Sequence, residues 1–217
     1  MESADFKNMR RAMVDSQLRT SGVTTPWVIG AMASVAREAF APATLKTTAY
    51  MDRSLPLGEG RALNPPLATG LMLEAADIAT EDTVLLIGTG AGYLAALLAG
   101  RASRVVAVEE STALLAEARQ HLAAFPNVKL VEAPLNQGAP DHAPYSVIIF
   151  DGAVAELPDH IIAQAAEDGL IITGITEGAV TRLASGHARG GKVALRTFAD
   201  SEIAVLPGFA SAKEFVF

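Results

Sequence analysis

The sequence predicts an α/β fold in which helices cover both faces of a doubly wound, mostly parallel, seven-stranded sheet, with a helical extension before it. Two observations predict this fold. From residue 83 onward, short apolar runs rich in β-branched residues alternate with helix-compatible stretches. One run ends in a glycine-rich turn, which is typical of a buried parallel strand that leads into a helix. We expect residues 1–66 to form the helical extension and a covering loop, and residues 67–217 the sheet domain, as one compact unit.

The apolar runs are five predicted strands, and the helix that follows the second of them has the clearest boundaries. Ser111 is suited to cap its first turn, and Pro126 stops it. Leucines and alanines at spacings of three and four place its apolar side on the sheet. The predicted strands are Thr83–Ile87, Arg104–Val108, Val128–Val131, Ser146–Phe150 and Gly169–Thr173.

Both ends of the chain carry weaker patterns. Residues 8–20 and 26–39 have helical periodicity, and Tyr50–Pro66 is rich in Pro and Gly, as a loop that covers a site would be. Near the other end, Gly190-Gly191 follows a predicted broken helix. The alternating runs after this glycine pair predict a hairpin, formed by Lys192–Phe198 and Ile203–Leu206.

Composition narrows the classes of function. The chain has 217 residues, half of them hydrophobic, with no cysteine and a net charge of −7. We therefore expect a globular protein that lacks disulfides, thiolate nucleophiles and a metal site, because its four histidines have no metal-ligand spacing. Apolar runs too short for a membrane span and a start unlike a signal peptide predict a cytoplasmic protein that binds no membrane. The acidic balance argues against nucleic acid as a partner.

The glycine-rich turn predicts a nucleoside site. Gly88, Gly90 and Gly92 let the backbone approach a ligand and adopt positive φ without steric cost. A dinucleotide fingerprint needs Gly-x-Gly-x-x-Gly, whereas here the third glycine comes one residue early and Tyr93 follows it. The spacing therefore disfavours NAD.

Glu109 closes the next strand, about 20 residues after the turn, where a carboxylate can accept both hydroxyls of a ribose. Together the turn and this carboxylate predict S-adenosylmethionine as the cofactor. The alternative is a turn that binds nothing, as in other α/β proteins. The expected cofactor-binding residues in this part of the chain are Gly88, Thr89, Gly90, Gly92, Tyr93 and Glu109.

Several segments resemble the protein-L-isoaspartate O-methyltransferase family. They are Met13–Arg19, Val28–Pro42, Ala49–Gly60, Ile87–Tyr93 and His142–Tyr145, which together extend over much of the chain. The resemblance implies a Rossmann-like methyltransferase that binds S-adenosylmethionine. It also implies methylation of the α-carboxylate of isoaspartyl residues in damaged peptides and proteins.

The chain departs from the pattern of that family at three places. Where the family loop reads approximately Thr-Ile-Ser-x-Pro, this sequence has Ala62 and Asn64 in place of the threonine and the serine. An amide can donate a hydrogen bond to a carboxylate, so Asn64 is the expected catalytic residue. After the third strand, Pro134 replaces the aspartate that reads adenine, which leaves backbone groups or Asn136 to hold the base.

Asp151 ends the fourth strand where the family often has alanine or threonine, and we include it among the cofactor-binding residues. It either makes a polar contact to cofactor or substrate, or caps the turn before Gly152. Asn64–Leu67 is similar to the Asn-Pro-Pro-aromatic motif of adenine-amino methyltransferases, but Leu67 cannot stack on a base. Three functions stay open: isoaspartyl methylation, methylation of a different acceptor, and a non-catalytic relative of this fold.

Overall fold

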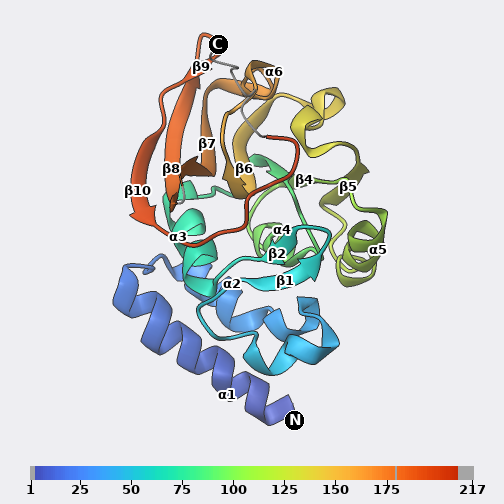
Figure 1. The fold of residues 1–217 in the computed structure, drawn as a ribbon, viewed down its shortest axis with the longest axis vertical. Coiled ribbons are helices and arrows are strands. Elements are labelled where there is room, and N and C mark those ends of the chain that lie inside the picture. Colours follow the sequence, from blue (N-terminus) through green and yellow to red (C-terminus); the bar gives the residue numbers. More distant parts are fainter. Residues whose placement is uncertain (1–2, 179, 210–217) are drawn as a thin grey trace, which may run out of the picture.

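The computed structural model describes residues 3–178 and 180–209, and its centre is a twisted sheet (Figure 1). The strands lie in the order β5-β4-β3-β6-β7-β8-β10, with the two-residue strand β9 paired to β8. Pairing is parallel from β5 to β7, whereas β8 is antiparallel to both β7 and β10. This arrangement confirms the predicted doubly wound, mostly parallel sheet, with seven strands in its main path and β9 as an eighth.

The five predicted strands are all present, and the structure extends most of them. β3 spans Thr83–Ile87 as expected, and β4 (Arg104–Glu109) and β5 (Val128–Glu132) each run one residue further. β6 (Tyr145–Val154) and β7 (Ala165–Glu177) are longer by several residues at one or both ends. The register shifts between them at two places, so an irregular pairing lengthens both strands beyond their apolar centres.

The helices on the sheet are α3 (Pro66–Ala76), α4 (Tyr93–Ala99), α5 (Thr112–His121) and the short α6 (Asp159–Ile162). Ser111 caps α5 as predicted, because its hydroxyl accepts the Leu114 backbone N–H at 3.2 Å. No helix within residues 3–178 and 180–209 is long and apolar enough to cross a bilayer.

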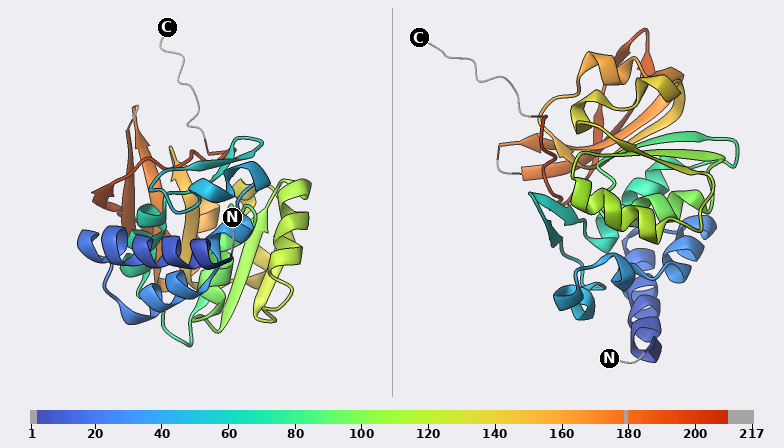
Figure 2. Two further views of the ribbon diagram at one scale, coloured as in Figure 1. Left: turned by 90° about the horizontal axis from the view of Figure 1, so that it is seen from below. Right: turned by 90° about the vertical axis from the view of Figure 1, so that its right-hand side faces the viewer.

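The N-terminal extension forms helices close to the predicted ranges. α1 (Ser3–Met13) continues as a π-helical turn (Val14–Leu18) and a 3₁₀ turn (Arg19–Ser21), and α2 (Pro26–Ser34) precedes 3₁₀ turns at Arg37–Phe40 and Ala43–Thr48. These helices gather at one end of the molecule (Figure 2). Their apolar side chains join one core cluster with Val84 and Leu86 of β3. The boundary at residue 66 stays a prediction.

Alternate residues of β3 point into different cores. Val84 and Leu86 face α3, α4 and the N-terminal helices, whereas Leu85 and Ile87 face α6 and the 3₁₀ turn Leu135–Gln137. Because both faces are covered, the strand reads as a continuous apolar run. This explains why the sequence predicted the strand but could not say which residues face which core.

Two predictions near the C-terminus are wrong. The stretch before Gly190-Gly191 is not a broken helix but β8 (Val180–Arg189), which pairs with β7 along eight residue pairs. Its helix-forming residues are overridden by this long antiparallel pairing. The glycine pair does form a turn, with φ of +57° and +73°, that joins β8 to β9 (Lys192–Val193).

The predicted hairpin of Lys192–Phe198 with Ile203–Leu206 is also absent from the described residues. β10 (Arg196–Asp200) pairs with β8 instead. The following segment Ser201–Phe209, which we name the C-terminal strap, leaves the edge of the sheet and crosses to β6. In Figure 1 it is the dark red segment that passes over the sheet beside the β1–β2 hairpin.

The Pro- and Gly-rich stretch between Tyr50 and Pro66 contains a small hairpin of β1 (Leu55–Gly58) and β2 (Arg61–Leu63). Its turn uses positive φ at Gly58, Glu59 and Gly60. The hairpin reaches the carboxyl ends of the central strands, as the contacts of Arg61 with Gly88 show. The stretch therefore covers a site as predicted, but as a hairpin and not as an irregular loop.

Replacement of Ser111 by Ala tests the capping of α5. Loss of the side-chain acceptor leaves the Leu114 N–H unsatisfied in a buried position, so we expect the free energy of unfolding to fall by about 1 kcal/mol. Urea denaturation measures the change. Ser16→Ala, at an exposed serine, is the control, and an equal effect of the two substitutions would contradict the capping role.

Candidate active site

The site lies where the strand order reverses between β3 and β6, at the carboxyl ends of the parallel strands. Such a reversal opens a crevice that binds ligands in doubly wound folds. The glycine turn follows β3 on one side, and Asp151 lies in β6 on the other. The topology thus brings together the two parts of the sequence that we predicted to be functional.

The glycine turn has the backbone shape that its glycines allow. Gly88, Gly90 and Gly92 have φ of +83°, +54° and +101°. The Gly88 and Thr89 N–H groups both donate to the Val108 carbonyl, at 2.9 and 3.1 Å, which ties the turn to β4. A side chain at Gly88 or Gly92 would be strained by these angles.

Glu109 organises the turn from the end of β4. It is fully buried, and its carboxylate accepts the N–H of Gly90 at 2.8 Å, of Glu110 at 3.1 Å and of Ser111 at 3.2 Å. Arg61 Nη2 lies 3.4 Å from the same carboxylate. Glu109 therefore lies beside the turn, as expected, but the protein itself uses both of its oxygens.

Thr89 and Tyr93 lie in the turn as expected, and both are buried. The Thr89 hydroxyl has no hydrogen-bond partner within the part of the chain that the structure describes. Tyr93 packs edge-on against Phe40, with ring centroids 5.5 Å apart, and Arg37 lies 4.9 Å from the Tyr93 ring centre. Tyr93 thus joins the turn to the N-terminal extension, whereas Thr89 offers an unused polar group.

Asn64 is buried and its amide is occupied. Nδ2 donates to the Asp151 Oδ1 at 2.8 Å and to the Asp151 carbonyl at 3.0 Å, and Oδ1 accepts the Ala204 N–H at 3.2 Å. Arg37 donates to the Asn64 carbonyl. In this structure the expected catalytic amide joins three segments: the loop after β2, the end of β6 and the strap.

Asp151 is buried close to charged and polar side chains. Burial raises the pKa of its carboxyl from 3.8 to about 6, while Asn64, Arg61 and Arg37 lower it in part and Glu109 raises it further. Asp151 accepts a hydrogen bond from Asn64 across the crevice, and its role toward a ligand stays a prediction.

Sequence reasoning missed two residues that fill the crevice. Arg61 Nη2 donates to the Gly88 carbonyl at 2.7 Å, and Leu206 from the strap is 2% exposed. A methyl group on Gly88 would lie 2.7 Å from Arg61 Nη2 and 3.0 Å from Leu206 Cδ2. Arg61 offered a signal, because it is a cation in a predicted covering loop three residues before Asn64. Leu206 offered none, since its position depends on where the strap crosses.

Groups at the expected adenine end also contact other parts of the protein. Pro134 starts the 3₁₀ turn Leu135–Gln137, and Asn136 Nδ2 lies 3.4 Å from the Gly208 carbonyl of the strap. Glu110 accepts the Leu135 N–H at 3.2 Å. Asn136, which we expected to help hold a base, contacts the strap.

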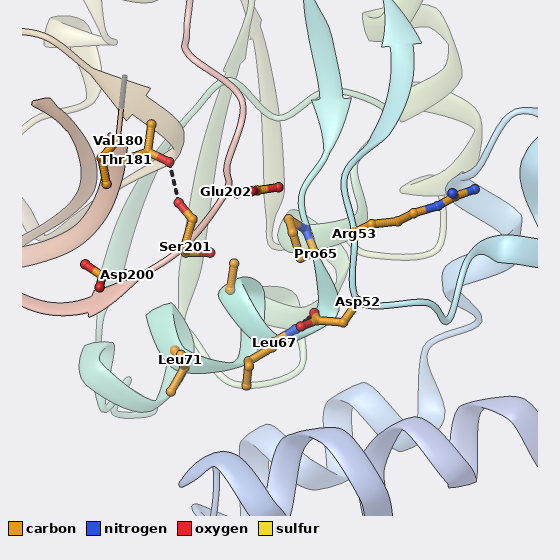
Figure 3. Close-up of a pocket in the computed structure, with 11 residues that line it drawn as sticks. Asp52, Arg53, Pro65, Leu67, Leu71, Val180, Thr181, Asp200, Ser201 and Glu202 are labelled. Carbon is orange, nitrogen blue, oxygen red and sulfur yellow. Dashed lines mark hydrogen bonds between the residues drawn. The ribbon is translucent and has the colours of Figure 1, made fainter. Parts of the chain in front are cut away.

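An open cavity of about 500 Å³ lies beside Pro65, the residue that follows Asn64 (Figure 3). Its walls come from the start of α3, from β8 and from the beginning of the strap, where Thr181 donates to the Ser201 carbonyl. The lining residues are Asp52, Arg53, Pro65, Leu67, Ala68, Leu71, Val180, Thr181, Asp200, Ser201 and Glu202. None of these is a residue of the glycine turn.

A doubly wound sheet of this order, with a glycine turn after β3 and an acidic residue at the end of β4, defines a Rossmann-like methyltransferase. The family model for protein-L-isoaspartate(D-aspartate) O-methyltransferase (PCMT) matches residues 8–201. The chain belongs to the protein-L-isoaspartate O-methyltransferase family.

Named relatives agree with this assignment, and solved structures share the fold. The chain is similar to the protein-L-isoaspartate O-methyltransferase of Methanoculleus marisnigri, with 37% identity over 79% of each chain. It is 38% identical to that of a Synechococcus species, over 81% of this chain and 72% of the relative. A solved protein-L-isoaspartate O-methyltransferase superposes with a TM-score of 0.79 at 20% identity, over 94% of this chain and 66% of that one. The PCMT of Plasmodium falciparum, in complex with S-adenosyl-L-homocysteine, gives 0.76 at 17% identity, over 93% and 97%.

The chemical groups at the glycine turn are of the kinds that bind a nucleoside cofactor. The glycine turn, the Glu109 carboxylate and the unpartnered hydroxyl of Thr89 are the groups that would hold one. The space beside them is filled by Arg61 and Leu206 in this conformation. The roles of Asn64, Asp151 and the turn residues toward ligands therefore stay predictions.

The raised pKa of Asp151 makes stability depend on pH in a defined direction. Between about pH 4 and 6 the folded protein keeps a proton that the unfolded chain has lost, so its stability falls as pH rises through this window. The shift corresponds to about 3 kcal/mol. Asp151→Asn removes the titration, and the unfolding free energy of this variant minus that of the wild type should rise by up to this amount from pH 4 to 7.

Urea denaturation at several pH values measures that difference. Asp141→Asn, at an exposed carboxylate, should show no comparable rise. A difference between Asp151→Asn and wild type that is independent of pH would show that Asp151 titrates as an ordinary carboxyl.

Proposed function

We propose that this protein methylates the α-carboxylate of isoaspartyl residues in damaged proteins, with S-adenosylmethionine as the methyl donor. The observation that carries the proposal is the glycine turn held against Glu109, with the Gly90 N–H 2.8 Å from its carboxylate, at the reversal point of the sheet. Membership of the family, and the names of relatives that cover most of the chain, support the acceptor. The cytoplasmic location expected from the sequence is part of this proposal.

The chain contributes binding and orientation. The backbone comes close to the ligand at Gly88, Gly90 and Gly92, and the Glu109 carboxylate accepts hydrogen bonds from the hydroxyls of a ribose. S-adenosylmethionine, when bound, supplies a methyl group on a sulfonium that acts as its own leaving group. An ionised carboxylate is already a nucleophile at neutral pH, so the protein needs no general base. Orientation in a site that excludes water is worth roughly 7–11 kcal/mol in such reactions.

Asn64 is the residue to which we assign the orientation of the acceptor carboxylate. Its Nδ2 donates to Asp151 in this structure, and an amide N–H can donate to a substrate carboxylate in the same way. This role requires Asn64 to exchange Asp151 for the substrate. The second candidate function is methylation of a different carboxylate acceptor. The contact between Asn64 and the Asp151 carboxylate favours it, because an amide reaches further than a serine hydroxyl and can bind a carboxylate placed differently.

Transfer of a tritium-labelled methyl group from S-adenosylmethionine to a peptide with one isoaspartyl residue tests the proposal. We expect labelled methyl ester with this peptide and none with the same peptide containing ordinary aspartate. Glu109→Gln should lower transfer by about 100-fold, because two hydrogen bonds from the ribose to a charged group are weakened.

Glu110→Gln is the matched control, since Glu110 is exposed and caps Leu135 instead of contacting the turn. It should retain transfer. Label in other carboxylates but not in isoaspartyl peptide would favour the second candidate. Cofactor binding without transfer to any acceptor would contradict both.

A further inference from the structure

The strap crosses the crevice in which a cofactor of this fold would lie. Its middle pairs with the end of β6: the Leu206 N–H donates to the Ala153 carbonyl at 2.8 Å, and the Ala153 N–H donates to the Ala204 carbonyl at 2.8 Å. Further along, Ala155 N–H donates to the Phe209 carbonyl at 3.2 Å. The strap therefore has a defined register on β6.

Leu206 fills the wedge between the glycine turn and β6. A methyl group on Gly152 would lie 2.7 Å from both Leu206 Cγ and Cδ2, and one on Gly88 would lie 3.0 Å from Cδ2. Phe209 is also buried and packs edge-on against Phe150, with ring centroids 5.5 Å apart. The Leu206 side chain thus occupies a position against the turn that a ligand would need, while Phe209 packs the strap onto β6.

Arg61 fills the polar half of the crevice. It is 4% exposed, its Nη2 contacts the Gly88 carbonyl and Glu109, and its Nη1 has no partner among the described residues. A ribose can reach Glu109 only if the carboxylate is accessible, and its exposed fraction is zero. Arg61 therefore takes the place of the ligand at this carboxylate.

Asn64 connects β6 with the strap. Its side chain bonds Asp151 of β6 and the Ala204 N–H of the strap, while Asn136 bonds Gly208 near the other end of the strap. The strap begins at Ser201 and Glu202, which line the open cavity of Figure 3, so a space lies next to the segment that would have to move.

We propose that the strap and Arg61 form an internal closure of the cofactor crevice, and that cofactor binding requires Leu206 to leave the glycine turn and Arg61 to release Glu109. This inference rests on the proposed function for the identity of the ligand. When only a fraction of molecules is open, the measured dissociation constant rises in inverse proportion to that fraction. A substitution that weakens the closure should therefore tighten binding.

Calorimetry with S-adenosylhomocysteine tests the closure. Leu206→Ala should bind at least tenfold more tightly than wild type, because it removes the side chain that fills the wedge. Val205→Ala is the matched control, since Val205 is the neighbouring strap residue and is 52% exposed; its affinity should stay within twofold of wild type. Arg61→Gln should also bind more tightly, and weaker binding would show that Arg61 is a ligand contact and not part of a closure. Thermal unfolding followed by circular dichroism verifies that each variant folds.

Hydrogen exchange in the wild-type protein gives a second readout. The amides of Ala153 and Leu206 should exchange slowly in the free protein and faster at saturating S-adenosylhomocysteine. Equal affinity of wild type and Leu206→Ala, no binding by either at millimolar ligand, or unchanged exchange in the strap would each overturn the closure. Tighter binding by Leu206→Ala with no methyl transfer would support the closure and reject the proposed function. Methyl transfer, together with equal affinities of wild type and Leu206→Ala, would support the proposed function and reject the closure.

Discussion

The structure of the site depends on one buried carboxylate. Glu109 accepts three backbone N–H groups and faces Arg61 at 3.4 Å, all without exposure to solvent. A buried carboxylate is stable only when such partners compensate for its lost hydration, and removal of one partner from a buried ion pair typically costs about 3–5 kcal/mol. The glycine turn, the start of α5 and the β1–β2 hairpin are therefore fastened to one another through this side chain.

The same network explains why the crevice is closed. Gly90 and Arg61 share one oxygen of Glu109, so the hairpin that carries Arg61 is drawn against the turn. Asn64, three residues further on, then reaches Asp151 and the strap. The residues that would serve a ligand are thus linked to each other, and the chain supplies its own occupants for a family site.

The departures from the family pattern gain a physical meaning in this context. Asn64 has one more hydrogen-bonding atom than a serine, and it uses both ends of its amide to bridge β6 and the strap. Asn136, near Pro134, contacts the strap at Gly208. Asn64 and the Pro134–Asn136 segment, at two of the places where the sequence leaves the family pattern, therefore both contact the strap.

The sequence by itself determined the parallel sheet, the glycine turn, Glu109 at the end of β4 and the cap at Ser111, because each depends on local residue types and spacing. Only the tertiary structure decided the strand identity of Val180–Arg189 and the path of Ser201–Phe209, since pairing with β7 and crossing to β6 join residues far apart in the chain. It also decided that Arg61 lies on Glu109 and that Asn64 lies on Asp151. These contacts span 48 and 87 residues, so no local pattern could predict them.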